Sequence, residues 1–308
     1  MRNQPYGFTV RGLKHVVTSW LVRAVAWVVR HVPARWLPAI GSVTARVLAL
    51  LTRKRQQLAE HNIRMALEED ISDESVREIR LRCLRNAVMT MMELLRLPIT
   101  SRQELIESVS VSGLEHLDGA LSEGRGVLAI TAHFGNWELC GARIVAGGYP
   151  MTAVARDAAH SGTARTINSA RESVGLSVIQ RGDTREMLRV LRRNGILAIL
   201  PDQHVVDGVL VNFMGRPAMT ATGPVRLAMK TGCRIVPAFC SRAADDSLHV
   251  ELEAPLELMA TGDAEADISA NTQLMNDAIG ASIRKRPEQW LWLHNRWKIS
   301  SGGGPQTR

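Results

Sequence analysis

From about residue 109 onward, short apolar runs alternate with longer stretches of helical periodicity. The run at 127–132, Val-Leu-Ala-Ile-Thr-Ala, follows Gly126 and has the length and β-branching of a core strand in a parallel sheet. This alternation predicts an α/β fold with a mixed, mostly parallel sheet flanked by helices. We expect strands at 109–112, 127–132, 151–155, 176–180, 196–200, 235–240 and 248–252, and helices near 114–122, 137–147, 160–174, 183–193, 222–231 and 266–286.

The segment before this alternation is unusually basic. Residues 1–59 contain ten Lys and Arg and no Asp or Glu, whereas the rest of the chain has 28 basic and 30 acidic residues. The excess of basic over acidic residues that gives the net charge of +8 therefore lies entirely within residues 1–59. Trp20, Trp27 and Trp36 lie there among valines, leucines and alanines, a pattern typical of a membrane-surface element with aromatic and basic anchors.

A clean transmembrane span is disfavoured in this segment. Arg23 and Arg30 interrupt its first apolar stretch, and each costs about 2.5 to 3.5 kcal/mol at a bilayer centre. Two prolines and Arg46 interrupt the next stretch. We expect two amphipathic helices in 1–59 that lie on or dip into the cytoplasmic leaflet of a membrane with an anionic surface, with bundle helices packed on protein as the alternative. A nucleic-acid-binding arm is disfavoured, because phosphate binding does not require large apolar side chains.

The sequence after residue 59 predicts one α/β domain at 60–298 and a disordered Gly-rich tail at 299–308. No cleavable signal peptide is evident, because arginines interrupt the apolar stretch, so we expect the domain to stay in the cytoplasm. A helix is expected at 72–97, with Ser75 and Glu78 at capping-box spacing. This helix contains Met89, Met91 and Met92, which are expected either to fill core or to line an acyl channel.

The motif His-Phe-Gly-Asn-Trp-Glu at 133–138 follows the first buried strand. Gly135 suits a turn, and Asn136 is a favourable N-cap for a helix from about 137. Within one continuous helix His133 and Glu138 would lie about 140° apart, so the turn is what allows them to meet.

A histidine beside a carboxylate can act as a general base near neutral pH. Glu138 would hold the tautomer of His133, and backbone donors near Gly135 and Asn136 would suit a developing oxyanion. The alternative is a turn histidine with satisfied hydrogen bonds and a first-turn carboxylate that favours the helix dipole. The motif alone leaves both interpretations open.

Further polar residues follow the ends of other predicted strands. Because ligands bind beyond the carboxyl ends of parallel strands, we expect His133, Arg156 and Asp202 to converge. Arginines in this region, Arg156, Arg171 and Arg181, are candidates for binding phosphate, although Arg171 can also be a solvated helix residue. Asp202 and Gln203 can orient substrate or hold the His133 loop by structural hydrogen bonds.

Metal, nucleotide and disulfide chemistry have little support. There is no G-x-G-x-x-G or Walker pattern, and a metal hydrolase built on His133, Glu138, Asp202 and His204 would lack the H-E-x-x-H motif. The chain has four cysteines, which are Cys83, Cys140, Cys233 and Cys240. They lack the close-pair spacing of metal ligands and are expected to be buried thiols. We expect no metal and no cofactor.

Four ordered blocks resemble one family. The H-x-x-x-x-E motif at 133–138 resembles the signature of the bacterial lipid A biosynthesis acyltransferases. The Asp-Gln pair in 198–203 and the F-x-G-x-x-A-x-T pattern at 213–220 resemble two further elements of that family. The block at 287–298 is similar to its QWxW…RW ending. A departure follows Gln203, where His-Val-Val-Asp stands in place of a more glycine-rich acidic stretch.

This resemblance implies a glycerolipid acyltransferase-like domain at the cytoplasmic face of the inner membrane. It implies acyl transfer from a thioester, usually on acyl carrier protein, to a glycolipid hydroxyl, most simply that of a lipid A precursor. His133 would be the general base and Glu138 its charge partner, and the substrate-binding residues would be Asn136, Arg156, Arg171, Asp202 and Gln203. The actinobacterial mannoside acyltransferases share the motif, so a phosphatidylinositol mannoside acceptor with a coenzyme A donor is an alternative. The other alternative is that the protein is a non-catalytic scaffold at the membrane surface.

Overall fold

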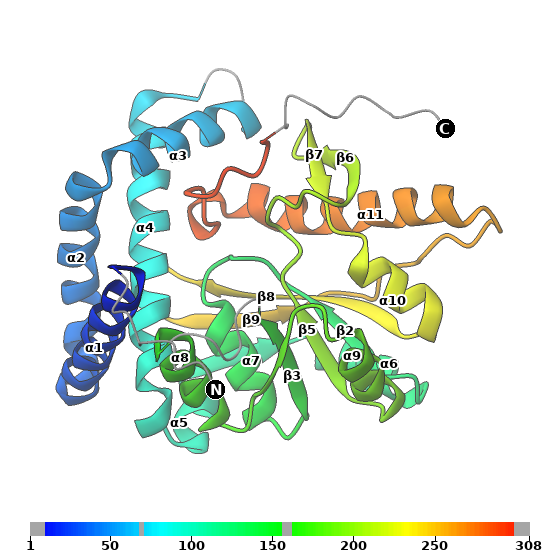
Figure 1. Cartoon of the computed structure of the whole chain (residues 1–308), viewed down its shortest axis with the longest axis horizontal. Coiled ribbons are helices and arrows are strands. Elements are labelled where there is room, and N and C mark those ends of the chain that lie inside the picture. The colour runs from blue at the N-terminus through cyan, green and yellow to red at the C-terminus, as the bar shows by residue number, and fades with distance from the viewer. Residues whose placement is uncertain (1–9, 68–70, 156–161, 299–308) are drawn as a thin grey trace, which may run out of the picture.

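The computed structural model describes residues 10–67, 71–155 and 162–298 (Figure 1). At its centre is a seven-stranded sheet in the order β1-β9-β8-β2-β5-β3-β4. All neighbouring strands are parallel except β8 and β9, which confirms the predicted mixed, mostly parallel sheet. The strands are β1 (Val109–Ser112), β2 (Val127–Ile130), β3 (Met151–Ala155), β4 (Ser177–Gln180), β5 (Ile196–Ile199), β8 (Arg234–Arg242) and β9 (Leu248–Leu252).

Strand β2 is buried on both faces because helices cover both sides of the sheet. Leu128 and Ile130 belong to one core cluster with residues of α9, α10 and α11, whereas Val127 and Ala129 belong to another with residues of α5, α6 and α7. This division follows from the alternation of side chains along a strand. The helices are α5 (Arg102–Ser108), α6 (Leu114–Ser122), α7 (Trp137–Ala146), α8 (Gly162–Glu172), α9 (Thr184–Arg192), α10 (Gly223–Thr231) and α11 (Ala264–Lys285).

A two-stranded antiparallel hairpin, β6 (Val209–Phe213) and β7 (Arg216–Thr220), lies outside the large sheet and packs on α11. Its two-residue turn has positive φ at both Met214 (53°) and Gly215 (87°). Two-residue hairpin turns of this kind favour Asn-Gly, and methionine rarely takes a positive φ. The sequence around this turn therefore lacks the usual hairpin signal, and the two strands were not predicted.

The N-terminal part of the described chain forms α1 (Val10–His31), α2 (Leu37–Leu51), α3 (Arg53–Ala66) and α4 (Asp73–Arg96). Both α1 and α2 pack on α4, and α1 also contacts α8 (Figure 1). Met89 and Met92 are buried there in a small cluster with Val29 and Leu37, so they fill core between the helices. The predicted cap of α4 was wrong, because the side chain that accepts the Ser75 N–H, at 3.1 Å, is that of Ser72.

The outer faces of α1 and α2 remain open and apolar. Trp20 and Trp27 of α1 are 66% and 64% exposed, and Leu50 and Leu51 of α2 are 70% and 75% exposed. The stretch Ala34–Leu51 is long and apolar enough to cross a membrane by length and composition alone, and 17% of it is buried. The two helices therefore contact protein with one face and leave an apolar face uncovered. The predicted tail at 299–308 lies outside the described residues.

Candidate active site

The turn that carries His133 is fixed from three directions. The Gly135 N–H donates to Gln289 O at 2.8 Å, and the Asn136 N–H donates to Cys240 O at 2.9 Å. The Thr90 hydroxyl on α4 donates to Gly135 O at 2.9 Å. Gly135 has φ +52°, and a Cβ there would lie 1.9 Å from Cys240 O, so only glycine fits this turn.

These hydrogen bonds correct one expectation. The backbone N–H groups of Gly135 and Asn136 already donate to carbonyls of the C-terminal segment and of β8. They are therefore committed to the fold and do not offer an oxyanion site. The physical reason is that the turn pairs with neighbouring chain segments, so its donors point into the protein.

His133 pairs with Asp202, which follows β5. Its ring Nδ1 lies 2.9 Å from Asp202 Oδ1, and its backbone N–H donates to Oδ2 at 2.9 Å. The Trp290 indole N–H also donates to Oδ2, at 2.9 Å. Burial alone would raise the pKa of Asp202, but the charge and hydrogen bonds of His133 and the Trp290 indole lower it to about 2. An ionised carboxylate at Nδ1 keeps the ring proton on that nitrogen.

Glu138 does not take the place predicted for it. Its carboxylate accepts from Arg171 of α8, with Nε to Oε2 at 2.8 Å and Nη2 to Oε1 at 2.6 Å. The Trp137 indole N–H donates to Oε1 at 3.0 Å. Glu138 lies in the first turn of α7, where it is buried and directed toward α8, so the carboxylate that contacts the imidazole is Asp202 instead.

Arg171 is likewise engaged within the protein. Besides Glu138, its Nη1 donates to Asn168 Oδ1 at 3.0 Å. Burial works against its charge, but the Glu138 carboxylate raises the pKa of the Arg171 guanidinium overall. Trp137 connects this pair to the histidine, because its ring meets the His133 imidazole edge to face at a centroid distance of 5.2 Å.

The remaining predicted site residues have different positions. Asn136 is fully buried and caps α7 as predicted, since its Oδ1 accepts the Leu139 N–H at 2.8 Å, while its Nδ2 donates to Glu93 at 2.5 Å. Gln203 reaches the reactive side of the ring, with Nε2 3.3 Å from His133 Nε2. Arg156 lies outside the described residues.

No site role was predicted from the sequence for Trp137 or Trp290. Trp290 does pack in an aromatic cluster with Phe213, Trp292 and Trp297. Its indole N–H nevertheless points at Asp202. No sequence signal distinguishes this indole from those of its neighbours.

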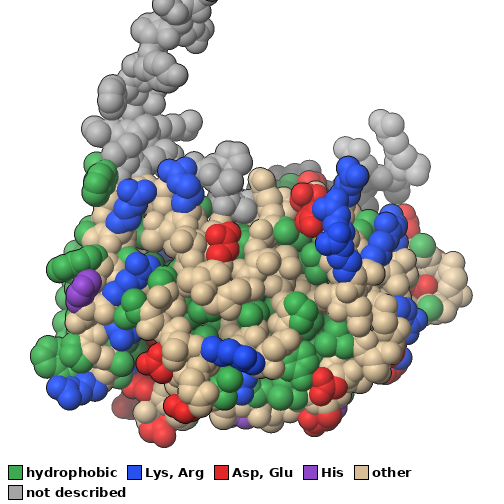
Figure 2. Space-filling model, turned by 90° about the horizontal axis from the view of Figure 1, so that it is seen from below, with side chains coloured by type: hydrophobic (Ala, Val, Ile, Leu, Met, Phe, Trp, Pro, Cys, Tyr) green, Lys and Arg blue, Asp and Glu red, His purple; other side chains and the backbone are tan. Residues whose placement is uncertain are grey.

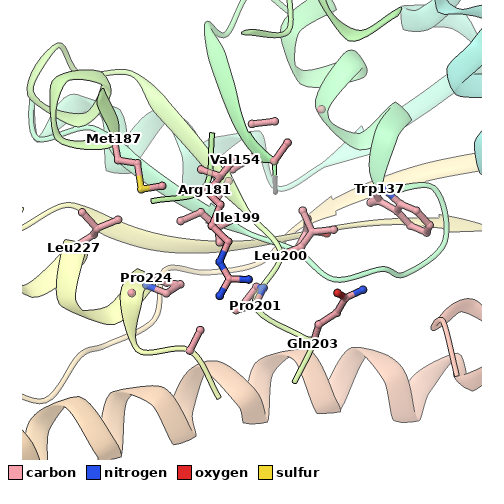
Figure 3. A pocket seen from close by; sticks show the side chains of 18 of the residues that line it. Trp137, Val154, Arg181, Met187, Ile199, Leu200, Pro201, Gln203, Pro224 and Leu227 are labelled. Carbon is pink, nitrogen blue, oxygen red and sulfur yellow. The ribbon is translucent and has the colours of Figure 1, made fainter. Parts of the chain in front are cut away.

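A cavity of about 640 Å³ opens beside His133 (Figure 3). One part lies between the sheet and α7, where Ala129, Ala153 and Ala198 stand side by side on three neighbouring strands and Gly141 lines the opposite wall. We call this part the alanine slot. Small side chains on both walls leave room for a slender apolar ligand.

Other cavity walls are apolar and basic. Val154, Ile199 and Leu227 line one wall, and the Arg181 side chain extends into the space near Pro201 and Pro224 (Figure 3).

Among the described residues, the site has neither a reactive thiol nor a metal cluster. Cys140 lines the cavity, but burial raises its pKa to about 12, which keeps it a neutral thiol and a poor nucleophile. Across 10–67, 71–155 and 162–298, no three His, Cys, Asp or Glu side chains gather in a group that could hold a metal ion.

The fold and site define an α/β protein with a histidine–carboxylate pair beside an apolar cavity at the carboxyl end of a parallel sheet. Residues 8–299 match the family model described as bacterial lipid A biosynthesis acyltransferase. The chain belongs to this family of acyltransferases.

Individual relatives are distant. The lipid A biosynthesis lauroyltransferase of Escherichia coli is 24% identical over 290 residues, which cover 93% of each chain. The phosphatidylinositol mannoside acyltransferase of Mycobacterium tuberculosis is 27% identical over 216 residues, 67% of this chain and 66% of that protein. The 1-acyl-sn-glycerophosphate acyltransferase PlsC of Thermotoga maritima is 11% identical with a TM-score of 0.34, covering 87% of this chain and 98% of that chain. That likeness is too weak to support an argument.

Proposed function

We propose that this protein transfers a fatty acyl group from a thioester donor to a hydroxyl of a glycolipid. The observation that carries the proposal is the His133–Asp202 pair, which opens onto the cavity that contains the alanine slot. A fatty chain in the slot would bring its thioester carbonyl toward His133. The resemblance and the family support acyl transfer, and the pair supplies a base where transfer requires one.

In the proposed mechanism, His133 Nε2 accepts the proton of the acceptor hydroxyl as that oxygen attacks the thioester carbonyl carbon. A carbon–oxygen bond forms, and the carbonyl oxygen becomes an oxyanion. The intermediate then expels the thiolate, which takes the proton from the imidazolium. Asp202 stabilises the imidazolium and holds Nδ1–H, as the carboxylate does in a catalytic triad.

We propose that Gln203 assists this step. Its side-chain amide lies 3.3 Å from His133 Nε2, so an acceptor hydroxyl that approached Nε2 would meet the amide as well. We assign Gln203 to orienting that hydroxyl or the developing oxyanion. Glu138 and Arg171 serve instead as a strut between α7 and α8 that shapes the cavity wall.

The acceptor is proposed to be a lipid A precursor, and the donor acyl carrier protein. The lauroyltransferase, which matches over 93% of the chain, is named for lipid A biosynthesis. A phosphatidylinositol mannoside acceptor with an acyl-coenzyme A donor is the second candidate, because the mannoside acyltransferase matches 67% of the chain.

The outer faces of α1 and α2 are proposed to bind the cytoplasmic surface of the inner membrane. Both faces are exposed and apolar, and the Arg23 guanidinium lies 5.7 Å from the ring centroid of Trp20, a pairing suited to the headgroup region. Replacing Trp20 and Trp27 by serine should reduce binding to vesicles that contain anionic lipid, measured by co-sedimentation. Unchanged binding would exclude this face as the contact.

The function is tested by mass spectrometry of lipids from cells with the wild-type protein, with no protein, and with His133→Ala. One acyl group should be missing from a glycolipid in the last two. The scaffold alternative predicts that His133→Ala behaves as wild type. The mass of the affected lipid separates the two acceptors.

A further inference from the structure

The cavity has a cationic mouth that the transfer step itself does not use. Arg181, Arg226 and Lys230 line it and are exposed, together with one acidic residue, Asp207. The ion pairs found within the described residues include none of these three cations. Three cations at a cavity mouth that have no acidic ion-pair partner among the described residues favour an anionic ligand group there.

These cations belong to a larger basic surface. Residues 181–193 and 222–231, which we call the α9–α10 surface, contain seven Lys and Arg and two Asp and Glu. Of the two acids, Glu186 pairs with Arg189, and Asp183 caps α9 by accepting the Glu186 N–H at 3.0 Å. The two segments carry a net charge of +5, whereas the chain beyond residue 59 as a whole has two more acidic than basic residues. Positive charge is therefore concentrated at this surface.

The surface lies far from the apolar helices. In Figure 1, α9 and α10 stand at the end of the molecule opposite α1 and α2. Figure 2 shows apolar side chains interspersed with Lys and Arg at the edge formed by the N-terminal helices, and further Lys and Arg side chains at the other end. A membrane bound through α1 and α2 would not cover the α9–α10 surface, which favours a soluble anionic partner.

We propose that the α9–α10 surface docks the acidic protein that carries the acyl thioester, with Arg181, Arg226 and Lys230 binding the phosphodiester of its pantetheine arm. The inference rests on the proposed acyl transfer. Such a donor has an apolar chain, a thioester, a flexible phosphorylated arm and an acidic protein surface. The protein presents the matching features together. The cavity has an apolar slot, His133 and a cationic mouth, and the basic α9–α10 surface adjoins that mouth.

The test compares three donors with the full-length protein: an acyl carrier protein thioester, acyl-coenzyme A, and acyl-pantetheine, which has neither phosphate nor protein. The variant is Arg226→Gln with Lys230→Gln. The matched control is Arg284→Gln with Lys285→Gln, an exposed Arg and Lys at the end of α11 that lie outside the site. Circular dichroism confirms that each variant folds.

For Arg226→Gln/Lys230→Gln we expect KM for the carrier-protein donor to rise about tenfold at low ionic strength, with kcat nearly unchanged. The rise should be smaller for acyl-coenzyme A and absent for acyl-pantetheine. It should shrink in about 1 M salt, which screens charges beyond about 3 Å. The control should behave as wild type.

Equal rises for the carrier-protein and coenzyme A donors would overturn the docking surface, because only the phosphate would then be sensed. No rise with either donor, or an equal rise in the control, would overturn it as well. Failure of the wild-type protein to turn over any thioester would instead defeat the proposed function.

Discussion

The carboxylate of Asp202 holds both the ring and the backbone of His133, with each hydrogen bond 2.9 Å long. One buried side chain thus fixes the orientation of the imidazole and the position of the turn that carries it. The Trp290 indole in turn fixes the carboxylate. The carboxylate that contacts the histidine, Asp202, is therefore not the carboxylate of the 133–138 motif, Glu138.

Replacing Asp202 by asparagine should lower kcat by about 10² to 10⁴-fold, because the neutral amide cannot stabilise an imidazolium and permits the wrong ring tautomer. Initial rates with a saturating thioester donor measure the effect. Glu138→Gln is the comparison, and its loss of kcat should be much smaller. A larger loss for Glu138→Gln than for Asp202→Asn would restore Glu138 as the partner of His133.

Asp202 should also make the stability of the fold depend on acid pH. Its pKa is about 2 in the folded protein and 3.8 as an ordinary aspartate, so the unfolded chain binds this proton first as the pH falls. The ionised carboxylate contributes about 2 to 3 kcal/mol above pH 4, and this contribution is lost between about pH 4 and pH 2. The test is urea unfolding of wild-type and Asp202→Asn protein from pH 6 to pH 2. The difference in unfolding free energy between the two proteins should decrease between about pH 4 and pH 2, and a constant difference would contradict the assignment.

The pair Glu138–Arg171 should be structural. The Glu138 and Arg171 side chains are only 4% and 17% exposed, so removing the carboxylate leaves a buried charge unpaired. Glu138→Ala should destabilise the protein by about 3 to 5 kcal/mol, and the double variant with Arg171→Ala should lose much less than the sum of the single losses. Denaturant unfolding of all four proteins completes the cycle. Additive losses would show that the two side chains do not depend on each other.

Filling the alanine slot should change which acyl chains are accepted. A Cβ at Gly141 would lie 3.1 Å from Leu176 Cδ2, so a larger side chain there must project into the slot or displace Leu176. We expect Gly141→Leu to favour shorter acyl chains, measured by competition between thioesters of different lengths. Gly119→Ala on α6 is a neutral control, since a Cβ there meets nothing within 4 Å. Unchanged chain selectivity in Gly141→Leu would place the acyl chain elsewhere.

Local patterns in the sequence determined the alternation of strands and helices, the turn at Gly135, the Asn136 cap and the apolar outer faces of the N-terminal helices. Each depends on periodicity, apolar runs or backbone preferences over a few residues, which a chain carries without reference to its fold. The position of His133 at a strand end followed from the same reasoning.

Only the tertiary structure decided which carboxylate contacts His133. Glu138 is near in sequence, but α7 turns it toward Arg171, while parallel pairing of β2 with β5 brings Asp202 to the imidazole from 69 residues away. The register of distant strands and the Glu138–Arg171 contact between α7 and α8 are global properties of the fold. The contact between Trp290 and Asp202 and the alanine slot also arise from segments far apart in the chain. For the same reason they could not be predicted from the sequence.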